Sequence, residues 1–273
     1  MNRSFKLIAL DVDGTLLKSD KSVHPDTPRD ICRVSEAGIE VVYCTGRGVA
    51  EMHPIFGFFP TIRYAVCCSG AVVYDRKSNQ TIHNEGIDRF LATKIADEAN
   101  ARSAMLHILT QDESIVSTSD LMRMDIFHMG IYQPTYLKLV RQVEDMSIEC
   151  RRQETIAKMN VYFRSPEDRN EAYETLRHLP LSFAFAEETS LEMTAKNVNK
   201  ASGLLVLLEY LGIDPKQTLG FGDAENDLEM LDLVGVSVAM GNAEEEIQQK
   251  CDIITTDNDH NGVGRAIYKI CSI

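Results

Sequence analysis

Several features that define large classes of protein are missing from this chain. No apolar run approaches the ~18 residues that a membrane-spanning helix needs, and the first strand-like run follows Met1-Asn2-Arg3-Ser4 directly, with no room for a signal peptide. We therefore expect no membrane partner and a cytoplasmic location. The formal net charge is -13 and no Lys/Arg run interrupts it, so we also expect no nucleic-acid partner.

Disulfide, zinc and nucleotide-binding patterns are missing as well. The seven cysteines are an odd number with neither paired zinc spacing nor a disulfide framework, and we expect them to be reduced thiols. The seven histidines do not cluster at ligand spacing, and the sequence contains no Gly-x-Gly-x-x-Gly or P-loop pattern. The sequence thus does not indicate a nucleotide cofactor.

The first part of the chain alternates between strand-like and helix-like segments. Strand-like runs cover residues 5–10, 39–44 and 64–68, and helices are expected over residues 26–37 and 49–56. Parallel strands need crossover connections, and helices of this length provide them. This order predicts a parallel α/β sheet.

The middle of the chain departs from this alternation. A hairpin is expected at residues 71–83, and strands and helices then follow in mixed order. The core pattern resumes with Leu191-Glu192-Met193, a leucine-rich helix at 199–211 and a strand at 218–222. We therefore predict a Rossmann-like parallel-sheet core, discontinuous over residues 1–83 and 191–273, with an inserted α+β domain at residues 84–190.

Two carboxylates follow the first strand-like run. Asp11 and Asp13 in Asp11-Val12-Asp13-Gly14-Thr15 are two residues apart, so both side chains can point the same way. Open α/β sheets bind ligands at the C-terminal ends of their strands, and Gly14 allows a sharp turn there. The pair suits one metal ion and one nucleophile. Asp and Gly are also common in solvated turns, so the motif alone leaves that alternative open.

Groups suited to a phosphate follow the second strand-like run and begin the leucine-rich helix. Thr45, Gly46 and Arg47 offer a hydroxyl, a flexible backbone N–H and a guanidinium. Lys200 lies at the N-terminal end of its helix, so its ammonium and the N-terminus of the helix can both stabilise an anion. Alternatively, Thr45 is only the N-cap of the next helix and Lys200 an ordinary surface lysine.

An acidic cluster follows the strand at residues 218–222. Asp223 is three residues from Asn226 and four from Asp227, so these side chains can share one face of a helix. An Mg²⁺ ion held by one or two carboxylates and a substrate phosphate would use such a face. Acidic residues are also common in a first helical turn as caps and dipole partners, so this cluster alone is ambiguous.

Taken together, the four clusters resemble the motifs of the haloacid dehalogenase superfamily of phosphatases in both order and spacing. The long insertion between Thr45 and Lys200, with Val238-Ala-Met-Gly-Asn-Ala243 and Asn261-Gly-Val263 downstream, is similar to the Cof-type branch. The resemblance covers nearly all of the core. It implies a small phosphorylated metabolite as the partner.

Two segments depart from the pattern of that branch. Cys68-Ser69-Gly70-Ala71 stands where Asn-Gly-Ala is usual, and Asn197-Val198-Asn199-Lys200-Ala201 replaces Gly-Val-Ser-Lys-Gly. Neither change removes a catalytic group. Both can alter the contacts to the leaving group, so the substrate is less well indicated than the class.

The resemblance implies catalytic roles for Asp11, Asp13, Lys200 and Asp227. Asp11 would be the nucleophile that forms an aspartyl-phosphate, and Asp13 the general acid and then the general base. Mg²⁺ would be held by Asp11, the backbone carbonyl of Asp13, and Asp223. Asp227 would orient Lys200 or a metal-bound water.

The resemblance also implies a set of phosphate-binding residues. Thr45 and Lys200 would bind the transferring phosphoryl group, and Asn226 would contact the phosphate. Gly46 and Arg47, which follow Thr45 directly, belong to the same site. A carboxylate can attack phosphorus only when charge repulsion is removed, which Mg²⁺ and Lys200 can do together.

Three functions agree with these residues. The leading hypothesis is an Mg²⁺-dependent phosphatase for small phosphorylated metabolites such as sugar phosphates, with residues 84–190 as a cap and the chain as a monomer or weak homodimer. A phosphotransferase or phosphosugar mutase would use the same chemistry with a hydroxyl acceptor. A non-catalytic metabolite-binding regulator would keep only the fold.

Overall fold

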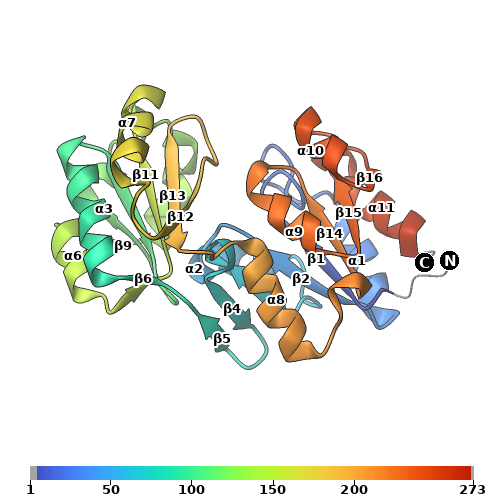
Figure 1. The fold of residues 1–273 in the computed structure, drawn as a ribbon. Helices are drawn as coiled ribbons and strands as arrows, with labels where there is room; N and C mark the ends of the chain where they lie inside the picture. The colour runs from blue at the N-terminus through green and yellow to red at the C-terminus, as the bar shows by residue number, and fades with distance from the viewer. Residues whose placement is uncertain (1–4, 272–273) are drawn as a thin grey trace. The chain divides into compact units, whose positions relative to one another are not determined.

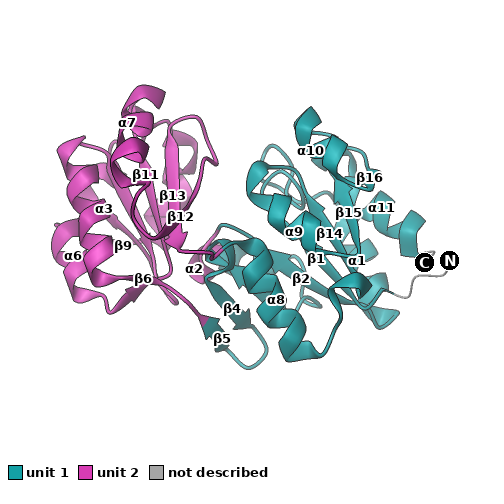
Figure 2. Ribbon diagram, viewed as in Figure 1, with its two compact units in different colours: residues 1–46, 52–83, 199–273 teal, residues 47–51, 84–198 magenta. Residues whose placement is uncertain are grey.

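The structure, a computed structural model, describes residues 5–271 and divides into two compact units (Figures 1 and 2). Unit 1 takes in residues up to 46, residues 52–83 and the chain from residue 199 onward. Unit 2 consists of residues 47–51 and 84–198. Within residues 5–271, the structure contains no helix with both the length and the apolar content to cross a membrane.

Unit 1 is built on an eight-stranded sheet with the order β16-β15-β14-β1-β2-β3-β4-β5. The six strands from β16 to β3 pair in parallel, and β4 adds to β3 in the antiparallel direction. The strands are β1 (Leu7–Leu10), β2 (Glu40–Cys44), β3 (Tyr64–Cys67), β4 (Val72–Asp75), β5 (Gln80–Asn84), β14 (Thr218–Gly222), β15 (Val236–Ala239) and β16 (Ile253–Ile254). The predicted parallel α/β core is confirmed.

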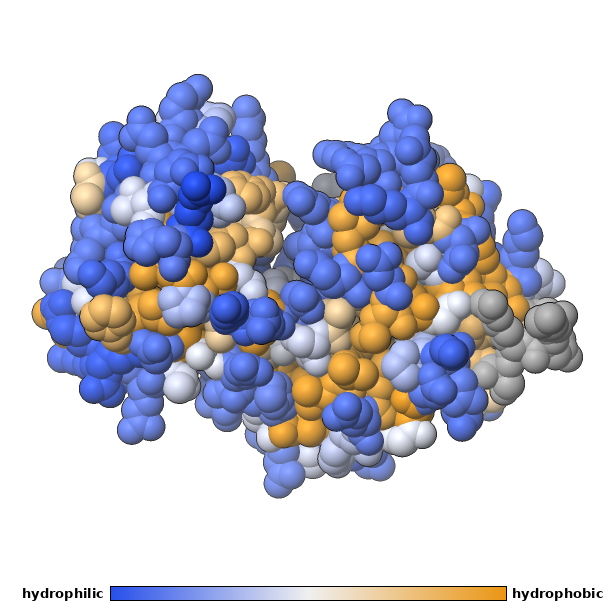
Figure 3. All heavy atoms as spheres, viewed as in Figure 1, coloured by the Kyte–Doolittle hydropathy of each residue, from blue (hydrophilic) through white to orange (hydrophobic). Residues whose placement is uncertain are grey.

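Helices connect these strands and supply the rest of the core of unit 1. They are α1 (Thr27–Glu36), α2 (Val49–Phe56), α8 (Lys200–Leu211), α9 (Leu228–Leu233), α10 (Glu245–Lys250) and α11 (Gly262–Cys271), with the first three residues of α2 assigned to unit 2. Leucines of α8 pack against β1 and β2 in one buried cluster. Leu205 of the same helix is 38% exposed, so α8 is apolar on its outer side as well. Figure 3 shows apolar surface over this part of unit 1.

Unit 2 has a six-stranded, mainly antiparallel sheet with the order β12-β13-β11-β7-β8-β9 and a separate pair, β10-β6. The strands are β6 (Ile87–Asp88), β7 (Met105–Leu109), β8 (Ser114–Ser117), β9 (Arg141–Val143), β10 (Thr155–Ile156), β11 (Lys158–Tyr162), β12 (Leu181–Ala184) and β13 (Ser190–Ala195). The helices are α3 (Arg89–Ala101), α4 (Thr118–Leu121), α5 (Gln133–Leu139), α6 (Met146–Arg152) and α7 (Pro166–Leu176).

The division of the chain differs from the expected boundaries at two places. Residues 191–193, expected in the core, form the middle of β13 and pair with β11 and β12 in the sheet of unit 2. Their alternation of buried and half-buried side chains fits a strand in either sheet, so the sequence does not reveal the partner. Residues 47–51 also belong to unit 2, although they lie far from its main segment in the sequence.

A buried polar group lies on the sheet of unit 2. His107 of β7 is 1% exposed, its Nε2 is 2.6 Å from the Ser114 hydroxyl oxygen, and its Nδ1 is 3.3 Å from the Tyr136 hydroxyl. Glu51 accepts a hydrogen bond from the Ser114 hydroxyl at 3.2 Å. Burial lowers the pKa of His107, although Glu51 acts in the opposite direction.

The buried imidazole should make stability depend on pH. The pKa of His107 in the folded protein lies below its value in the unfolded chain, so below about pH 6.5 the unfolded state takes up the proton first. His107 should therefore contribute a fall in the free energy of unfolding of up to ~1.4 kcal/mol per pH unit as the pH drops from 6.5 toward 5, whereas buried carboxyl groups with raised pKa values contribute in the opposite direction. Denaturant titrations at each pH would measure this slope.

Two variants isolate the contribution of His107 to that slope. His107→Gln lacks this contribution, so its free energy of unfolding relative to that of the wild type should rise as the pH drops from 6.5 toward 5, whatever its stability at neutral pH. His178 is exposed, and His178→Gln should keep the wild-type slope. Equal slopes in the wild type and His107→Gln would show that another group causes the pH dependence.

Candidate active site

The predicted site residues gather at the C-terminal edge of the parallel sheet in unit 1. Asp11 follows β1, Thr45 follows β2 and Asp223 follows β14, and these three strands are parallel neighbours. The hydrogen bonding between β1 and β14 continues one residue beyond β1, where the Asp11 N–H donates to the Phe221 carbonyl at 3.1 Å. Side chains from distant parts of the sequence therefore meet at one edge.

Lys200 lies at the centre of the cluster and is 2% exposed. Its Nζ donates to Asp11 Oδ1 at 2.7 Å and to Asp227 Oδ1 at 2.6 Å, and it lies 3.3 Å from Asn226 Oδ1. The ammonium thus joins the strand end at Asp11 to the loop after β14. The surface-lysine alternative is wrong for this residue.

The position of Lys200 follows from how its helix begins. Asn199 caps α8 in a capping box: its Oδ1 accepts the Ser202 N–H at 2.9 Å, and its own N–H donates to Ser202 Oγ at 3.0 Å. Gly70, with φ +103°, packs against this N-terminus so closely that a Cβ there would lie 1.9 Å from the Asn199 carbonyl oxygen. The two segments that depart from the Cof-type pattern are therefore in contact, and together they fix the start of α8.

Asp227 lies in the cluster, but it does not share a helix face with Asp223 as its spacing in the sequence suggests. It ends a short 3₁₀ helix, η5 (Glu225–Asp227), and its Oδ2 accepts the backbone N–H groups of Asp223 and Ala224 at 3.0 and 3.1 Å. Asp223 itself precedes η5, so the two carboxylates do not share one helix face. Asp227 instead folds the loop after β14 back on itself and turns its other oxygen to Lys200.

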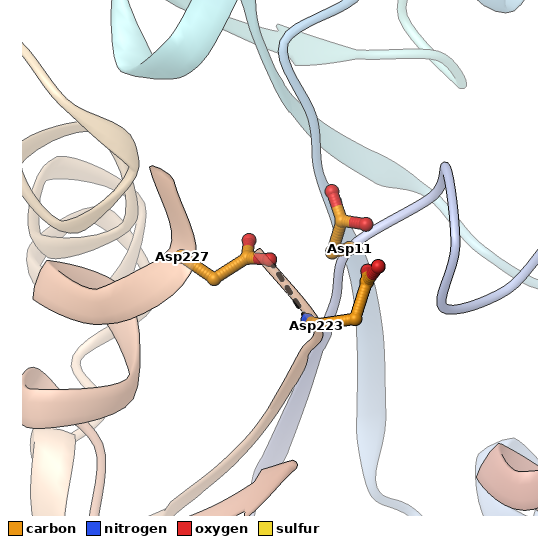
Figure 4. A group of neighbouring side chains, drawn as sticks. All are labelled: Asp11, Asp223 and Asp227. Atoms are coloured by element: carbon orange, nitrogen blue, oxygen red, sulfur yellow. Dashed lines mark hydrogen bonds between the residues drawn. The ribbon is translucent and has the colours of Figure 1, made fainter. Parts of the chain in front are cut away.

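Three carboxylates converge in this region (Figure 4). Asp11, Asp223 and Asp227 each offer an oxygen, and these oxygens lie within 4.8 Å of one another. Burial raises the pKa of Asp11 well above its usual range, the charge of Asp227 raises it further, and Lys200 opposes both. Burial likewise raises the pKa of Asp223 to about 6, and Asp227 adds to the effect.

The charges of this cluster do not balance without a cation. Burial alone would lower the pKa of Lys200, but Asp11 and Asp227 raise it, so the ammonium stays charged. When all three carboxylates are ionised, one ammonium leaves two negative charges uncompensated, and the raised pKa values of Asp11 and Asp223 reflect this repulsion together with burial. Closely spaced carboxylate oxygens are the ligands that Mg²⁺ prefers. Because Asp227 is already bound by Lys200 and two N–H groups, Asp11 and Asp223 are the side chains that fit a divalent cation.

Asp13 lies at the open side of the cluster. Its side chain is 36% exposed, and its Oδ1 accepts a hydrogen bond from Lys21 Nζ at 3.0 Å. Gly14 follows with φ +84°, and a Cβ there would lie 2.2 Å from Asp223 Oδ2. This position therefore needs glycine both for its conformation and for the close approach of Asp223. The predicted sharp turn after Asp13 is present, and Asp11 and Asp13 have different environments.

The segment Thr45-Gly46-Arg47 is split between the two units. Thr45 is buried after β2, its N–H donates to the Val66 carbonyl at 2.8 Å, and its own carbonyl accepts the Ser69 N–H at 3.0 Å. Gly46 is the last residue of this part of unit 1, whereas Arg47 belongs to unit 2. The structure thus brings six predicted residues to the edge of the sheet in unit 1 together with Thr45 and Gly46. The six are Asp11, Asp13, Lys200, Asp223, Asn226 and Asp227.

Two further residues contact the site and were not assigned a role from the sequence. Thr15 Oγ1 donates to Asp223 Oδ1 at 2.8 Å, and Asn242 Nδ2 lies 3.4 Å from Asp223 Oδ2. Both stand in segments that carry the family resemblance, Thr15 in the segment that begins at Asp11 and Asn242 in the segment that begins at Val238. The signal that could have found Asn242 is its position just after a buried strand of the same parallel sheet.

A parallel α/β sheet with carboxylates and a lysine at its C-terminal edge defines an enzyme that acts on an anionic substrate. A family model described as haloacid dehalogenase-like hydrolase matches residues 8–267. The chain belongs to this family, as its motifs predict, and it is a phosphatase of the haloacid dehalogenase superfamily.

Curated relatives match over nearly their whole length. The chain is 26% identical over 267 residues to the 5-amino-6-(5-phospho-D-ribitylamino)uracil phosphatase of Bacillus subtilis, covering 96% of this chain and 94% of that protein. It is 24% identical over 268 residues to the pyridoxal phosphate phosphatase of Escherichia coli, covering 96% and 97%. The substrates in the names of these two relatives are both small phosphorylated molecules.

Solved structures share the fold. A haloacid dehalogenase-like hydrolase from Bacteroides thetaiotaomicron superposes with a TM-score of 0.85 at 24% identity, covering 97% of this chain and 99% of that one. A sugar phosphatase of subclass IIB of the superfamily superposes with a TM-score of 0.84 at 20% identity, covering 98% and 100%. The predicted fold class is confirmed.

Proposed function

We propose that this phosphatase hydrolyses small phosphomonoesters, sugar phosphates or similar metabolites, with Mg²⁺ and through an aspartyl-phosphate on Asp11. The observation that carries the proposal is the cluster in which Lys200 binds Asp11 and Asp227, and in which oxygens of Asp11, Asp223 and Asp227 lie within 4.8 Å of one another. Such a cluster suits a divalent cation and the phosphoryl group of a substrate. The named substrates of the two curated relatives agree with this substrate class.

In the first step, a carboxylate oxygen of Asp11 attacks the phosphorus atom, and the ester P–O bond breaks. Asp13 donates a proton to the leaving oxygen, so the product is a neutral alcohol. In the second step, Asp13 takes a proton from water, and the water oxygen attacks the same phosphorus atom. The acyl P–O bond then breaks and releases inorganic phosphate and the Asp11 carboxylate.

Asp11, Asp223 and the carbonyl of Asp13 would hold Mg²⁺, which supplies positive charge to the phosphoryl oxygens when bound. Lys200 offsets charge on Asp11 and on the phosphoryl group, and Asp227 keeps the ammonium in place. Asp13 can exchange a proton with an alcohol or with water because its side chain is partly exposed.

Other predicted residues contribute to binding in this proposal. Thr45, Gly46 and Asn226 bind the phosphate, with a hydroxyl, a backbone N–H and a side-chain amide. Arg47 binds the substrate from the segment that belongs to unit 2. We further propose that unit 2 acts as the cap that selects the leaving group, and that the protein works in the cytoplasm as a monomer or weak homodimer.

The test is inorganic phosphate release from a panel of sugar phosphates, nucleotides and cofactor phosphates, with Mg²⁺ and with a chelator. We expect one phosphate per substrate molecule from at least one sugar phosphate or similar metabolite, and loss of at least ~10²-fold in rate when the metal is removed, because the cluster then lacks its cation.

Each contrary result would change a different part of the proposal. Substrate isomerisation with almost no phosphate release would favour a mutase. Tight binding of a phosphorylated ligand without any reaction would favour a regulator. Full activity in the chelator would refute the role of Mg²⁺.

A further inference from the structure

The loop after β15 brings Asn242 against the metal-binding carboxylate of the proposed site. Asn242 Nδ2 donates to the Gly14 carbonyl at 2.9 Å and lies 3.4 Å from Asp223 Oδ2. Its Oδ1 accepts the backbone N–H of Asn258 at 3.0 Å. One exposed side chain therefore connects three segments of unit 1 that are distant in the sequence.

The carboxylate of Asp223 is held from several sides. Thr15 donates its hydroxyl to Oδ1 at 2.8 Å, and the amide of Asn242 lies beside Oδ2. Gly14 lies so close to Oδ2 that no side chain could stand between them. These contacts fix the plane of the carboxylate before any ligand arrives.

A second asparagine supports the first. Asn258 is 6% exposed, and its Nδ2 donates to the Leu17 carbonyl at 2.9 Å. Asn242 and Asn258 thus bind the carbonyls at the two ends of the turn Gly14–Leu17, and a backbone bridge joins Asp13 to Leu17. The same hydrogen bonds therefore link the turn that begins at Asp13 to the orientation of Asp223.

We infer that Asn242 is a positioning residue for the divalent-cation site, which it serves by fixing the carboxylate of Asp223 and the turn after Asp13. This inference rests on the proposed function, in which Asp223 is a ligand of Mg²⁺. A carboxylate that is free to rotate must be ordered when the cation binds, which weakens binding. Replacing a side chain that hydrogen-bonds to a metal ligand typically weakens metal binding by ~10–100-fold.

A purely structural role for Asn242 would be to shape its own loop, and Gln248 allows that role to be tested. Gln248 Nε2 donates to the carbonyls of Gly241 and Ala243 at 3.2 and 2.9 Å. Gln248→Ala therefore loosens the same loop and leaves the amide beside Asp223 in place. It is the matched control for Asn242→Ala.

The experiment uses the full chain and Mg²⁺ alone, titrated by calorimetry without substrate. We expect Asn242→Ala to raise the Kd for Mg²⁺ by ~10–100-fold, and Gln248→Ala by less than about threefold. Thr15→Val removes the other donor to Asp223 and should also raise the Kd. Because both residues act on one carboxylate, the double variant should lose less than the product of the two single effects.

Phosphate release then separates this inference from the proposed function. In Asn242→Ala, the Mg²⁺ concentration for half-maximal activity should rise by the same factor as the Kd. An unchanged Kd in Asn242→Ala, or equal shifts in Asn242→Ala and Gln248→Ala, would overturn the inference while an active wild type keeps the proposed function. The expected shifts in Kd with a wild type that releases no phosphate would uphold the inference and overturn the function.

Discussion

Asp11→Asn should abolish phosphate release while the protein stays folded. Removing the nucleophile of a covalent mechanism costs on the order of 10⁴-fold or more in kcat, because no other group at the site can take its place. An amide side chain of the same shape cannot form the acyl-phosphate. Initial rates of phosphate release at saturating Mg²⁺ would measure the loss.

The same substitution should leave stability unchanged or raise it when no metal is present. Burial and Asp227 raise the pKa of Asp11, so its charged form is disfavoured in the folded chain, and a neutral amide removes this repulsion. Lys200 keeps Asp227 as a partner in the variant. A thermal midpoint in chelator at or above the wild-type value would therefore show that lost activity is not lost folding.

Asp112 provides the matched control for this experiment. It is an exposed aspartate in unit 2, and Asp112→Asn makes the same chemical change away from the carboxylate cluster. We expect wild-type rates and stability from it. Activity of Asp11→Asn within tenfold of the wild type would exclude Asp11 as the nucleophile.

The sequence predicts the core of this protein well because its signals are local. A strand-like run followed by a polar cluster predicts both a strand and the end of that strand at which a ligand binds. Asp11 and Asp223 can therefore be placed at one edge of the sheet before the structure is known. Lys200 is placed by a clear helix start, with Asn199 as the cap. Each of these inferences needs only a few neighbouring residues.

The parts that the sequence does not predict depend on contacts between distant segments. The strand pattern of residues 190–195 is the same whichever sheet it joins, so its place in unit 2 is set by pairing with β11 and β12. The helix α5 ends at Leu139, because the residues that follow, Arg141–Val143, pair with β8. Asp227 is spaced as for a helix face but caps a loop instead. Tertiary hydrogen bonds decide all three cases.

Lys200→Met should affect activity and stability together, unlike Asp11→Asn. Without the ammonium, Asp11 and Asp227 remain buried with no positive partner among the contacts described for the cluster. Breaking a buried ion pair by removing one partner costs about 3–5 kcal/mol in free energy of unfolding. We also expect kcat/KM to fall by ~10³-fold, the scale of removing one group that stabilises transition-state charge. Denaturant titration and phosphate release would measure the two effects.

The loss of stability in Lys200→Met should depend on pH in a direction that identifies its cause. Lys200 lowers the pKa of Asp11, so removing it leaves carboxyl groups whose folded pKa lies further above the unfolded value. Such groups bind more protons in the folded state, and stability therefore falls as the pH rises. The variant should be closest to the wild type near pH 5 and furthest from it near pH 8. Lys216→Met, at an exposed lysine of unit 1, should show neither effect, and a deficit independent of pH would mean that Lys200 stabilises the fold by packing alone.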